Sequence, residues 1–311
     1  MTGPHNGTER VAYIGLGSMG AGMARNLLRR LDGDLMVFDA RPDAVAAFAA
    51  EGAKPATSLP DLADRTLVFL SLPGPPEFEA VVFGKGGLAE VLRPGALIVD
   101  LTTNRRETVI EAAEKLATQG IELVDSPVSG GKTGAEEGRL TLGVGGTAAA
   151  VERARPYMEA FATLVLHAGN IGAGDVCKLI HNLGLHILRQ AMAEMFTIAT
   201  KAGVDPAVVY EFVRTGSFGR HDQLKWLPTR VFNGEFETTE TPWFRHALSL
   251  KDIRLAMELA GEVEVPTPLG SSCHELAEEA TRRGWDDRDS WVIFSLQEEA
   301  AGVRVRTGTG S

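Results

Sequence analysis

Between about residues 11 and 168, seven short runs rich in apolar and β-branched residues alternate with segments of helical periodicity. The runs are VAYIGLG, LMVFDA, TLVFLSL, ALIVDLT, IELVDSPV, LTLGVGG and TLVLHAG. Strands that alternate with helices usually form a mostly parallel sheet joined by crossover helices. Several of the runs are apolar throughout, which is typical of strands covered on both faces. The pattern therefore predicts an α/β fold with a doubly wound sheet.

The pattern changes after about residue 170. From Gly172 to Gly203 there is no proline and apolar residues recur at helical spacing, which predicts one helix of about 30 residues and roughly 45 Å. The later segments PAVVYEFVRTG, LSLKDIRLAMELA, LGSSCHELAEEATRRG and DSWVIFSLQEEAAG also predict helices. We expect a flexible N-terminus (1–10), an α/β domain (11–169), an all-helical domain (170–302) and a flexible tail (303–311), with the long helix joining the two domains.

The composition limits the partners that the chain can have. Its 311 residues are 44% hydrophobic and 23% charged, which is ordinary for a soluble protein with two domains. A formal net charge of −10, without a run of Lys or Arg, argues against a nucleic-acid or anionic membrane surface. The two cysteines are too few for a disulfide framework or a CxxC metal site. We expect a cytoplasmic protein with small-molecule partners and no metal.

A glycine-rich loop follows the first predicted strand, with glycines at Gly15, Gly17 and Gly20. In such a loop the first glycine permits a tight turn, and the second lets backbone N–H groups approach a diphosphate. The third lets the following helix pack closely on the strand. The loop is completed by Leu16, Ser18 and Met19. Because strand, loop and helix follow in the required order, the first domain is predicted to be a Rossmann domain that binds a nicotinamide dinucleotide.

Asp39 ends the second predicted strand, 19 residues after Gly20. An acidic residue at this place accepts hydrogen bonds from the adenosine ribose, and its charge repels a 2′-phosphate. The sequence thus favours NAD, although NADP stays possible because Arg41 could turn toward a 2′-phosphate. Leu72 and Pro73 follow a later strand, where an adenosine could rest.

The stretch YIGLGSMGAGMARNL resembles the opening signature of the β-hydroxyacid dehydrogenase family, which includes 3-hydroxyisobutyrate dehydrogenase, tartronate semialdehyde reductase and glyoxylate reductases. The resemblance continues, in order and approximate spacing, to about residue 300. The further matching segments are SLPGPPEFEAVVFGKGGL, IVDLTT, VDSPVSGGKTGAEEGRLTLGVGG, GAGDVCKLIHN and SLKDIRLAMELA. The resemblance implies an NAD(P)-dependent oxidoreductase that interconverts a small β-hydroxyacid and its semialdehyde or keto form.

The resemblance also implies roles for particular residues. Ser129, Gly130 and Gly131 match the family block that binds the substrate, and their composition is that of an anion-binding nest. Lys178 matches the family's catalytic acid/base. Asn182 matches an asparagine that hydrogen-bonds the substrate.

Lys178 and Asn182 are four residues apart, so both project from one face of the predicted long helix. Partial burial beside a positively charged nicotinamide would lower the pKa of Lys178, which suits proton exchange near neutrality. A lysine that reaches past apolar neighbours to water is the ordinary alternative. Lys251 matches a family lysine that reaches the cofactor. Thr103 follows a predicted strand at the edge where α/β sheets bind ligands, and is a candidate contact of the nicotinamide.

His181 departs from the family pattern, in which asparagine is more usual. It lies three residues after Lys178, so the two side chains can be neighbours. Three roles stay open: contact with an unusual substrate, modulation of Lys178, or packing against a neighbouring helix. The last is slightly favoured, since most helical histidines have no catalytic role.

Two other functions stay open. An imine reductase shares the scaffold but typically has another residue at the lysine position, so Lys178 argues against it. A non-catalytic cofactor-binding protein would have no need of Ser129, Lys178 and Asn182 together. For any of these functions, the family resemblance and the large apolar helix faces imply a homodimer or homotetramer.

Overall fold

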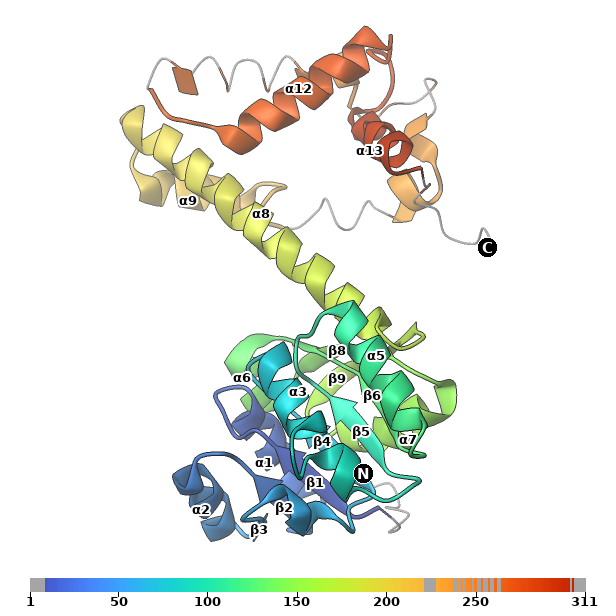
Figure 1. Cartoon of the computed structure of the whole chain (residues 1–311). Coiled ribbons are helices and arrows are strands. Elements are labelled where there is room, and N and C mark those ends of the chain that lie inside the picture. Colours follow the sequence, from blue (N-terminus) through green and yellow to red (C-terminus); the bar gives the residue numbers. More distant parts are fainter. Residues whose placement is uncertain are drawn as a thin grey trace. The chain divides into compact units, whose positions relative to one another are not determined.

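In a computed structural model of the chain, each of the seven predicted strand segments contains a strand (Figure 1). The structure describes residues 9–220, 228–237, 240, 242, 244–247, 249–250, 253, 257, 260–261, 264–302 and 304. Two short strands, β3 and β7 below, were not predicted. The strands are β1 (Val11–Ile14), β2 (Leu35–Phe38), β3 (Lys54–Pro55), β4 (Leu67–Leu70), β5 (Leu97–Asp100), β6 (Glu122–Asp125), β7 (Val128–Ser129), β8 (Leu140–Gly145) and β9 (Ala162–Gly169).

These strands form one sheet in the order β3-β2-β1-β4-β5-β6-β8-β7, with β9 also paired to β8. The pairs from β3 to β6 are parallel, as is β8 with β9, whereas β8 is antiparallel to both β6 and β7. The prediction of a mostly parallel sheet is therefore confirmed. The strand order reverses at β1, which has β2 on one side and β4 on the other, and α/β sheets bind ligands at such a reversal.

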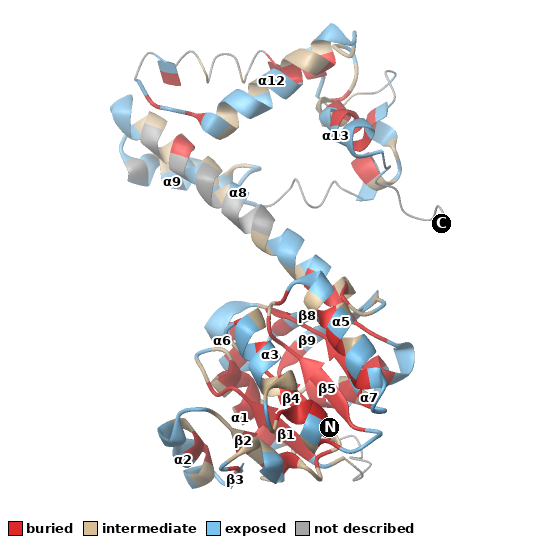
Figure 2. Cartoon of the chain, in the orientation of Figure 1, coloured by how far each residue is buried: buried red, intermediate tan, exposed pale blue. Residues whose placement is uncertain are grey.

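Helices cover both faces of the sheet, as the doubly wound prediction requires. They are α1 (Gly20–Arg30), α2 (Pro42–Ala50), α3 (Pro75–Phe83), α4 (Leu88–Val91), α5 (Arg106–Ala117), α6 (Gly131–Glu137) and α7 (Ala148–Met158). Along β1, Val11 and Tyr13 join one core with α1, α2, α6 and α7, while Ala12 and Ile14 join a second core with α3, α4 and α5. Figure 2 shows the central strands β4 and β5, between these cores, as buried.

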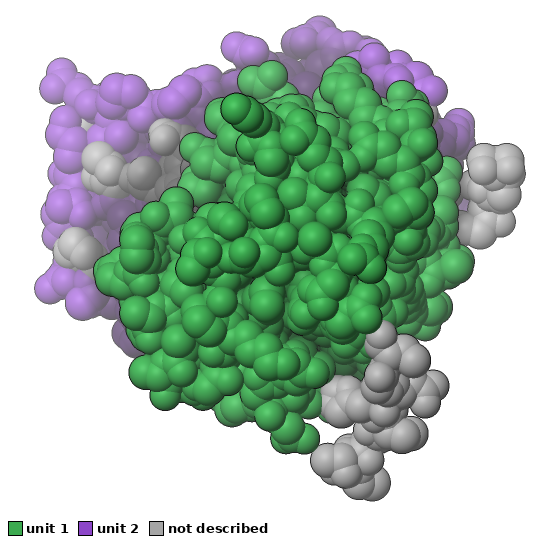
Figure 3. All heavy atoms as spheres, turned by 60° about the horizontal axis from the view of Figure 1, so that its bottom comes forward, with its two compact units in different colours: residues 1–183 green, residues 184–311 purple. Residues whose placement is uncertain are grey.

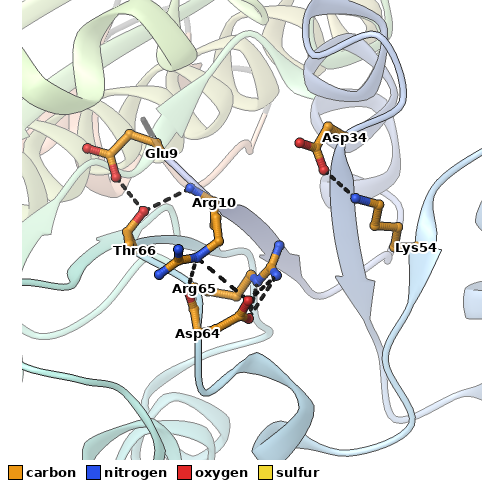
Figure 4. Close-up of polar contacts among 7 residues, drawn as sticks. All are labelled: Glu9, Arg10, Asp34, Lys54, Asp64, Arg65 and Thr66. Carbon is orange, nitrogen blue, oxygen red and sulfur yellow. Dashed lines mark hydrogen bonds and ion pairs between the residues drawn. The ribbon is translucent and has the colours of Figure 1, made fainter. Parts of the chain in front are cut away.

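The beginning of the first domain is fastened to the sheet (Figure 4). The Thr66 hydroxyl donates to Glu9 at 2.5 Å and accepts a hydrogen bond from the Arg10 backbone N–H at 2.9 Å. Arg153 of α7 donates two hydrogen bonds to Glu9, at 2.7 and 2.9 Å, and holds the pKa of that carboxyl below its ordinary value. Glu9 and Arg10, predicted to belong to a flexible terminus, are instead held by these bonds. Residues 1–8 lie outside the described residues.

The chain divides into two compact units, residues 1–183 and 184–311 (Figure 3). Helix α8 (Ala173–Lys201) is the predicted long helix, and it begins in the first unit. The boundary predicted at 169/170 lies before this helix, whereas the compact units divide within it. The first turns of α8 belong to the first unit because they are hydrogen-bonded to β6 and to the loop after β5.

The second unit is helical, as expected. Its described elements are α9 (Pro206–Thr215), α12 (Pro268–Arg282), α13 (Ile293–Ala301), a π-helical turn (Pro228–Phe232) and two 3₁₀ turns (Glu235–Glu237 and Ser290–Val292). Its described residues contribute no strand to the sheet, and an isolated antiparallel bridge joins Arg245 to Asp289. Of the predicted tail, only Arg304 is among the described residues. No helix among the described residues has the length and apolarity to span a membrane.

Candidate active site

The carboxyl ends of the parallel strands lie at one edge of the sheet and bring several predicted residues together. Gly15 follows β1, Asp39 follows β2, Ser71 follows β4, and Thr103 lies just beyond the end of β5. This edge is where parallel α/β sheets bind their ligands. The first turn of α8 is hydrogen-bonded to the end of β6 at the same edge. The edge therefore carries both the glycine loop and the helix that holds Lys178.

The three glycines of the loop have different surroundings. Gly15 has a φ of +94°, and a Cβ on it would lie 2.1 Å from the Ser71 carbonyl oxygen. A Cβ on Gly20 would lie 1.9 Å from the Gly15 carbonyl oxygen, whereas a Cβ on Gly17 would have no neighbour within 4 Å. The first and third glycines are therefore required by the turn itself. Gly17 instead leaves open space beside the backbone.

Asp39 is held at the end of β2 by the loop that it faces. Its carboxylate accepts hydrogen bonds from Leu16 N at 2.7 Å, from Arg41 N at 2.8 Å and from Arg41 Nε at 3.2 Å. Burial acts to raise the pKa of Asp39, but these hydrogen bonds, chiefly from Arg41, outweigh it and lower the pKa. The Arg41 guanidinium also donates to the Leu16 carbonyl at 3.2 Å. Asp39 is therefore ionised at neutral pH.

A pocket of about 680 Å³ opens between these segments. The predicted cofactor residues that line it are Gly15, Gly17, Ser18, Met19, Gly20, Asp39, Leu72 and Pro73. It is also lined by residues that sequence reasoning did not assign: Ile14, Phe38, Ala40, Ser71, Glu77 and Val81, together with Arg41. Glu77 and Val81 are four residues apart on α3, a spacing that could have indicated a shared face. Leu16 and Thr103 do not line the pocket.

The pocket fits a dinucleotide. Its wall includes the N-terminus of α1, where no side chain caps the free N–H groups, and such N–H groups bind phosphate. The open space at Gly17 gives a diphosphate access to that backbone. Asp39, just after β2, supplies a carboxylate acceptor for ribose hydroxyls. The chemistry of the wall thus suits both the diphosphate and the ribose of the adenosine diphosphate.

The predicted substrate loop lies between β7 and α6. Ser129 ends β7, Gly130 precedes α6 with a φ of +134°, and Gly131 begins α6 with a φ of +65°. Helix α6 packs against α1, because Asn26 of α1 donates hydrogen bonds to the carbonyls of Ala135 at 2.8 Å and Glu136 at 3.2 Å. The helices that follow the two glycine-rich loops are therefore neighbours.

His181 of α8 contacts this loop. His181 Nε2 lies 3.0 Å from Ser129 Oγ. The histidine was expected to pack against a neighbouring helix. In the structure the ring is hydrogen-bonded to a serine of the predicted substrate loop. Such a contact joins residues 52 apart in the chain, so no local pattern could indicate it.

Lys178 is partly buried, and burial lowers the pKa of its ammonium group below the ordinary 10.5. Asn182 is also partly buried, one turn further along α8. Lys251 lies outside the described residues. Lys178, Asn182 and the Ser129 loop thus belong to one compact unit with the pocket.

Four polar residues that sequence reasoning did not select connect α8 to the sheet: Asp100, Asn104, Asp125 and Asp175. All four are nearly fully buried. Buried acidic residues are uncommon and are usually hydrogen-bonded. Asp100 and Asp125 each end an apolar strand, a position that could have indicated a buried, hydrogen-bonded carboxyl group.

Two family models cover most of the chain. Residues 10–169 match the NAD-binding domain of 6-phosphogluconate dehydrogenase. Residues 172–296 match the domain described as the NAD-binding domain of NADP-dependent 3-hydroxyisobutyrate dehydrogenase. Both descriptions agree with the order of the motifs along the sequence.

Relatives of established name are similar over nearly their full lengths. A 2-(hydroxymethyl)glutarate dehydrogenase of Eubacterium barkeri is 31% identical over 96% of this chain and 98% of the relative. A 3-hydroxyisobutyrate dehydrogenase of Pseudomonas aeruginosa is 35% identical over 86% of this chain and 90% of the relative. An imine reductase structure from Myxococcus stipitatus superimposes with a TM-score of 0.81, covering 93% of this chain and 99% of that one, but at 14% identity it shows the shared fold alone.

The geometry and the comparisons agree with the function that the motifs implied. The chain has the dinucleotide-binding pocket at the reversal of the sheet, and it matches named dehydrogenases at 31% and 35% identity. The chain therefore belongs to the β-hydroxyacid dehydrogenase family and is an NAD(P)-dependent oxidoreductase that acts on a CH–OH group.

Proposed function

We propose that this enzyme interconverts a small β-hydroxyacid and its semialdehyde or keto form, with Lys178 as general acid/base and NAD as the preferred cofactor. The observation that carries the proposal is the partly buried Lys178, whose pKa burial lowers, on a helix that begins at the same sheet edge as the dinucleotide pocket. A lysine with a lowered pKa can both give and take a proton near neutral pH.

The substrate carboxylate would be held by the loop between β7 and α6. Ser129 offers a hydroxyl donor, and the backbone N–H groups at Gly130 and Gly131 carry no side chain that shields them. Successive N–H groups in a turn with positive φ favour an anion. His181 Nε2, 3.0 Å from Ser129 Oγ, would share a hydrogen bond with that hydroxyl. Asn182 would hydrogen-bond the other polar groups of the substrate.

Lys178 would exchange the proton of the reacting oxygen. In the direction of oxidation the neutral amine takes the hydroxyl proton, and in the direction of reduction the ammonium group returns it. Bound nicotinamide supplies the acceptor or donor of the hydride. The pocket residues Gly17 and Asp39 would hold the diphosphate and the adenosine ribose, and Leu72, Pro73, Thr103 and Lys251 remain proposed contacts.

The preference for NAD rests on Asp39. Its ionised carboxylate lines the pocket and would repel a 2′-phosphate. Arg41 lines the same pocket but is hydrogen-bonded to Asp39, at 3.2 Å, and to the Leu16 carbonyl. An arginine that already has these two partners must leave them before it can bind a phosphate.

Two further properties are proposed from the family resemblance: a homodimer or homotetramer, and a cytoplasmic location. Light scattering on the purified protein measures the first, and the distribution of the tagged protein between cell fractions measures the second. The small-molecule partner is a hydroxyacid or its aldehyde.

A panel of β-hydroxyacids, assayed for NADH formation with NAD and then with NADP, tests the proposed function. Turnover of at least one hydroxyacid, faster with NAD, is the expected result. Binding of NADH without turnover of any hydroxyacid would favour a non-catalytic protein, and reduction of cyclic imines in its place would favour an imine reductase.

A further inference from the structure

A buried set of hydrogen bonds ties the first turn of α8 to the sheet. Asp125, the last residue of β6, accepts hydrogen bonds from the backbone N–H groups of Gly172 and Asp175, both at 2.7 Å. These N–H groups lie at the N-terminus of α8, where they have no partner within the helix and where negative charge is favourable. Asp125 therefore caps α8 from another element.

The side chain of Asp175 continues the network. Its Oδ1 accepts a hydrogen bond from Asn104 N at 2.7 Å, and the Asn104 amide donates to Asp100 Oδ2 at 2.7 Å. Asp100 ends β5 and is the register partner of Asp125 on β6. All four side chains belong to residues that are at most 3% exposed. The ends of two strands, the loop after β5 and the first turn of α8 are thus held together.

The backbone around this network is packed so closely that glycine is required. A Cβ on Gly174 would lie 2.5 Å from the Asp125 carbonyl oxygen and 2.6 Å from that of Gly143. A Cβ on Gly145 would lie 2.2 Å from Asp125 Oδ1. The first turn of α8 is therefore pressed against β6 and β8, and small movements of one are transmitted to the other.

No cation offsets the three carboxyl groups among the hydrogen-bond partners just named. Two cations lie near the network: Lys178, on the next turn of α8, and Arg106 of α5, whose Cγ would be 3.0 Å from a Cβ on Gly172. The Arg106 side chain is 53% exposed and lies 3.9 Å from Glu107. Burial raises the pKa of Asp175 to about 8 and that of Asp100 to about 7. Burial also raises the pKa of Asp125.

The free acceptors of the network indicate where a proton belongs. Asp175 Oδ2 and Asn104 Oδ1 are buried without a hydrogen-bond partner among the described residues. A buried acceptor without a partner is unfavourable, and a proton on Asp175 Oδ2 turns one of these acceptors into a donor. Asp125 faces the positive end of α8 and is the carboxyl that best tolerates a negative charge.

We propose that Asp175, carried as a neutral carboxylic acid, is a positioning residue for Lys178. Lys178 lies three residues further along α8, on the neighbouring turn of the same face. The network that fixes Asp175 therefore fixes the direction in which Lys178 leaves the helix. Ionised Asp175 adds a negative charge beside Asp100 and Asp125 and weakens this attachment. The inference rests on the proposed role of Lys178.

Two substitutions at this position test the proposal. Asp175→Asn keeps the acceptor for Asn104 N and is always neutral, so kcat should stay within about threefold of the wild type, whereas Asp175→Ala should lower kcat by about 10- to 100-fold, because a displaced acid/base costs about that much. The dissociation constant of NADH, measured by fluorescence, should not change in either variant. Glu107→Ala, which removes an exposed acid from the first turn of α5, is the matched control and should keep the wild-type kcat.

The pH dependence of the melting temperature tests separately whether Asp175 is protonated in the folded protein. Between its ordinary pKa of 3.8 and about 8, Asp175 holds its proton in the folded chain but not in the unfolded chain. The melting temperature of the wild type should therefore fall, relative to that of Asp175→Asn, as the pH rises through this window. Below this window Asp175 is protonated in both the folded and the unfolded wild type, and above it in neither. The difference in melting temperature between the wild type and Asp175→Asn is therefore constant outside the window.

The proposal is overturned if Asp175→Asn loses as much kcat as Asp175→Ala, or if both variants keep the wild-type kcat. Equal pH dependence of the melting temperature in Asp175→Asn and the wild type also overturns it. If Asp175→Ala does not fold, the Asn variant and its melting curve decide the matter alone. A wild-type protein without turnover removes the role of Lys178 and the positioning claim with it, while the melting curves still show whether Asp175 is neutral.

Discussion

His181 on α8 and Ser129 at the end of β7 form a hydrogen bond, with 3.0 Å between Nε2 and Oγ. The serine belongs to the loop proposed to bind the substrate carboxylate, and the histidine stands where the family more often has asparagine. If the imidazole donates to Oγ, the serine hydroxyl stays available as a donor to the substrate. If the imidazole accepts, the hydroxyl proton points toward the ring, and Ser129 cannot donate it to the substrate. The pair therefore controls the hydrogen bond that Ser129 can make.

This pair predicts that His181→Leu raises KM for the hydroxyacid by about 2- to 12-fold, the value of one hydrogen bond, with little change in kcat. His181→Asn, the residue more usual in the family, keeps a donor and should restore most of the affinity. A double-mutant cycle with Ser129→Ala checks the coupling. If the two single effects simply add, the histidine does not act through Ser129.

Removal of the Lys178 amine should affect chemistry and not cofactor binding. Lys178→Ala is expected to lower kcat by about 10²- to 10⁴-fold, the usual contribution of a general acid/base, while the dissociation constant of NADH changes little. Lys201→Ala, at the far end of the same helix, is the control and should leave both constants unchanged. A Lys178→Ala enzyme with the wild-type rate would refute the assignment.

The pH dependence of the rate should reflect the buried position of Lys178. Burial lowers the pKa of its ammonium group below 10.5, so the reduction, which needs the ammonium form, slows as the pH rises through the lowered pKa. The oxidation needs the neutral amine and slows as the pH falls through it. Profiles of kcat in both directions measure this. Profiles that are flat in both directions would show that no group with such a pKa limits the rate.

Asp39 should decide between the two cofactors. Asp39→Ala removes a charged acceptor of the ribose hydroxyls, and kcat/KM for NAD should fall by about 10- to 100-fold. It also releases Arg41, so kcat/KM for NADP should rise relative to that for NAD. Asp43→Ala, an exposed acid of α2 outside the pocket, is the control. Better use of NADP than of NAD by the wild type would contradict the role given to Asp39.

Gly15 and Gly17 should respond differently to alanine. Gly15→Ala places a Cβ 2.1 Å from the Ser71 carbonyl oxygen at a φ of +94°, and the free energy of unfolding should fall by about 2–3 kcal/mol from strain and overpacking. Gly17→Ala meets nothing within 4 Å, so stability should be kept while NADH binds more weakly. Denaturant unfolding and NADH fluorescence measure the two effects. Equal loss of stability in both variants would show that Gly17 is also confined by the fold.

The sequence was sufficient for the fold because its signals are local. Local patterns predict each element from its own residues. Examples are the apolar runs around Val11, Leu67 and Leu97, which predict buried strands, and the periodic segment after Gly172, which predicts the long helix. The glycine loop can be recognised in the same way. The tight turn, the approach of a diphosphate and the packing of the helix all depend on residues between Gly15 and Gly20. The short strands β3 and β7 were missed because two residues carry no periodicity.

The sequence by itself determined the two-domain organisation, the dinucleotide pocket and the family, because five ordered motifs specify them together. Only the tertiary structure shows which groups His181 and Asp175 contact. Their partners, Ser129 and Asn104, lie 52 and 71 residues away, and no periodicity or spacing relates such residues. Only the folding of α8 against the ends of β5, β6 and β7 brings these groups within hydrogen-bond distance, and burial at that place then sets the protonation of the carboxyl groups.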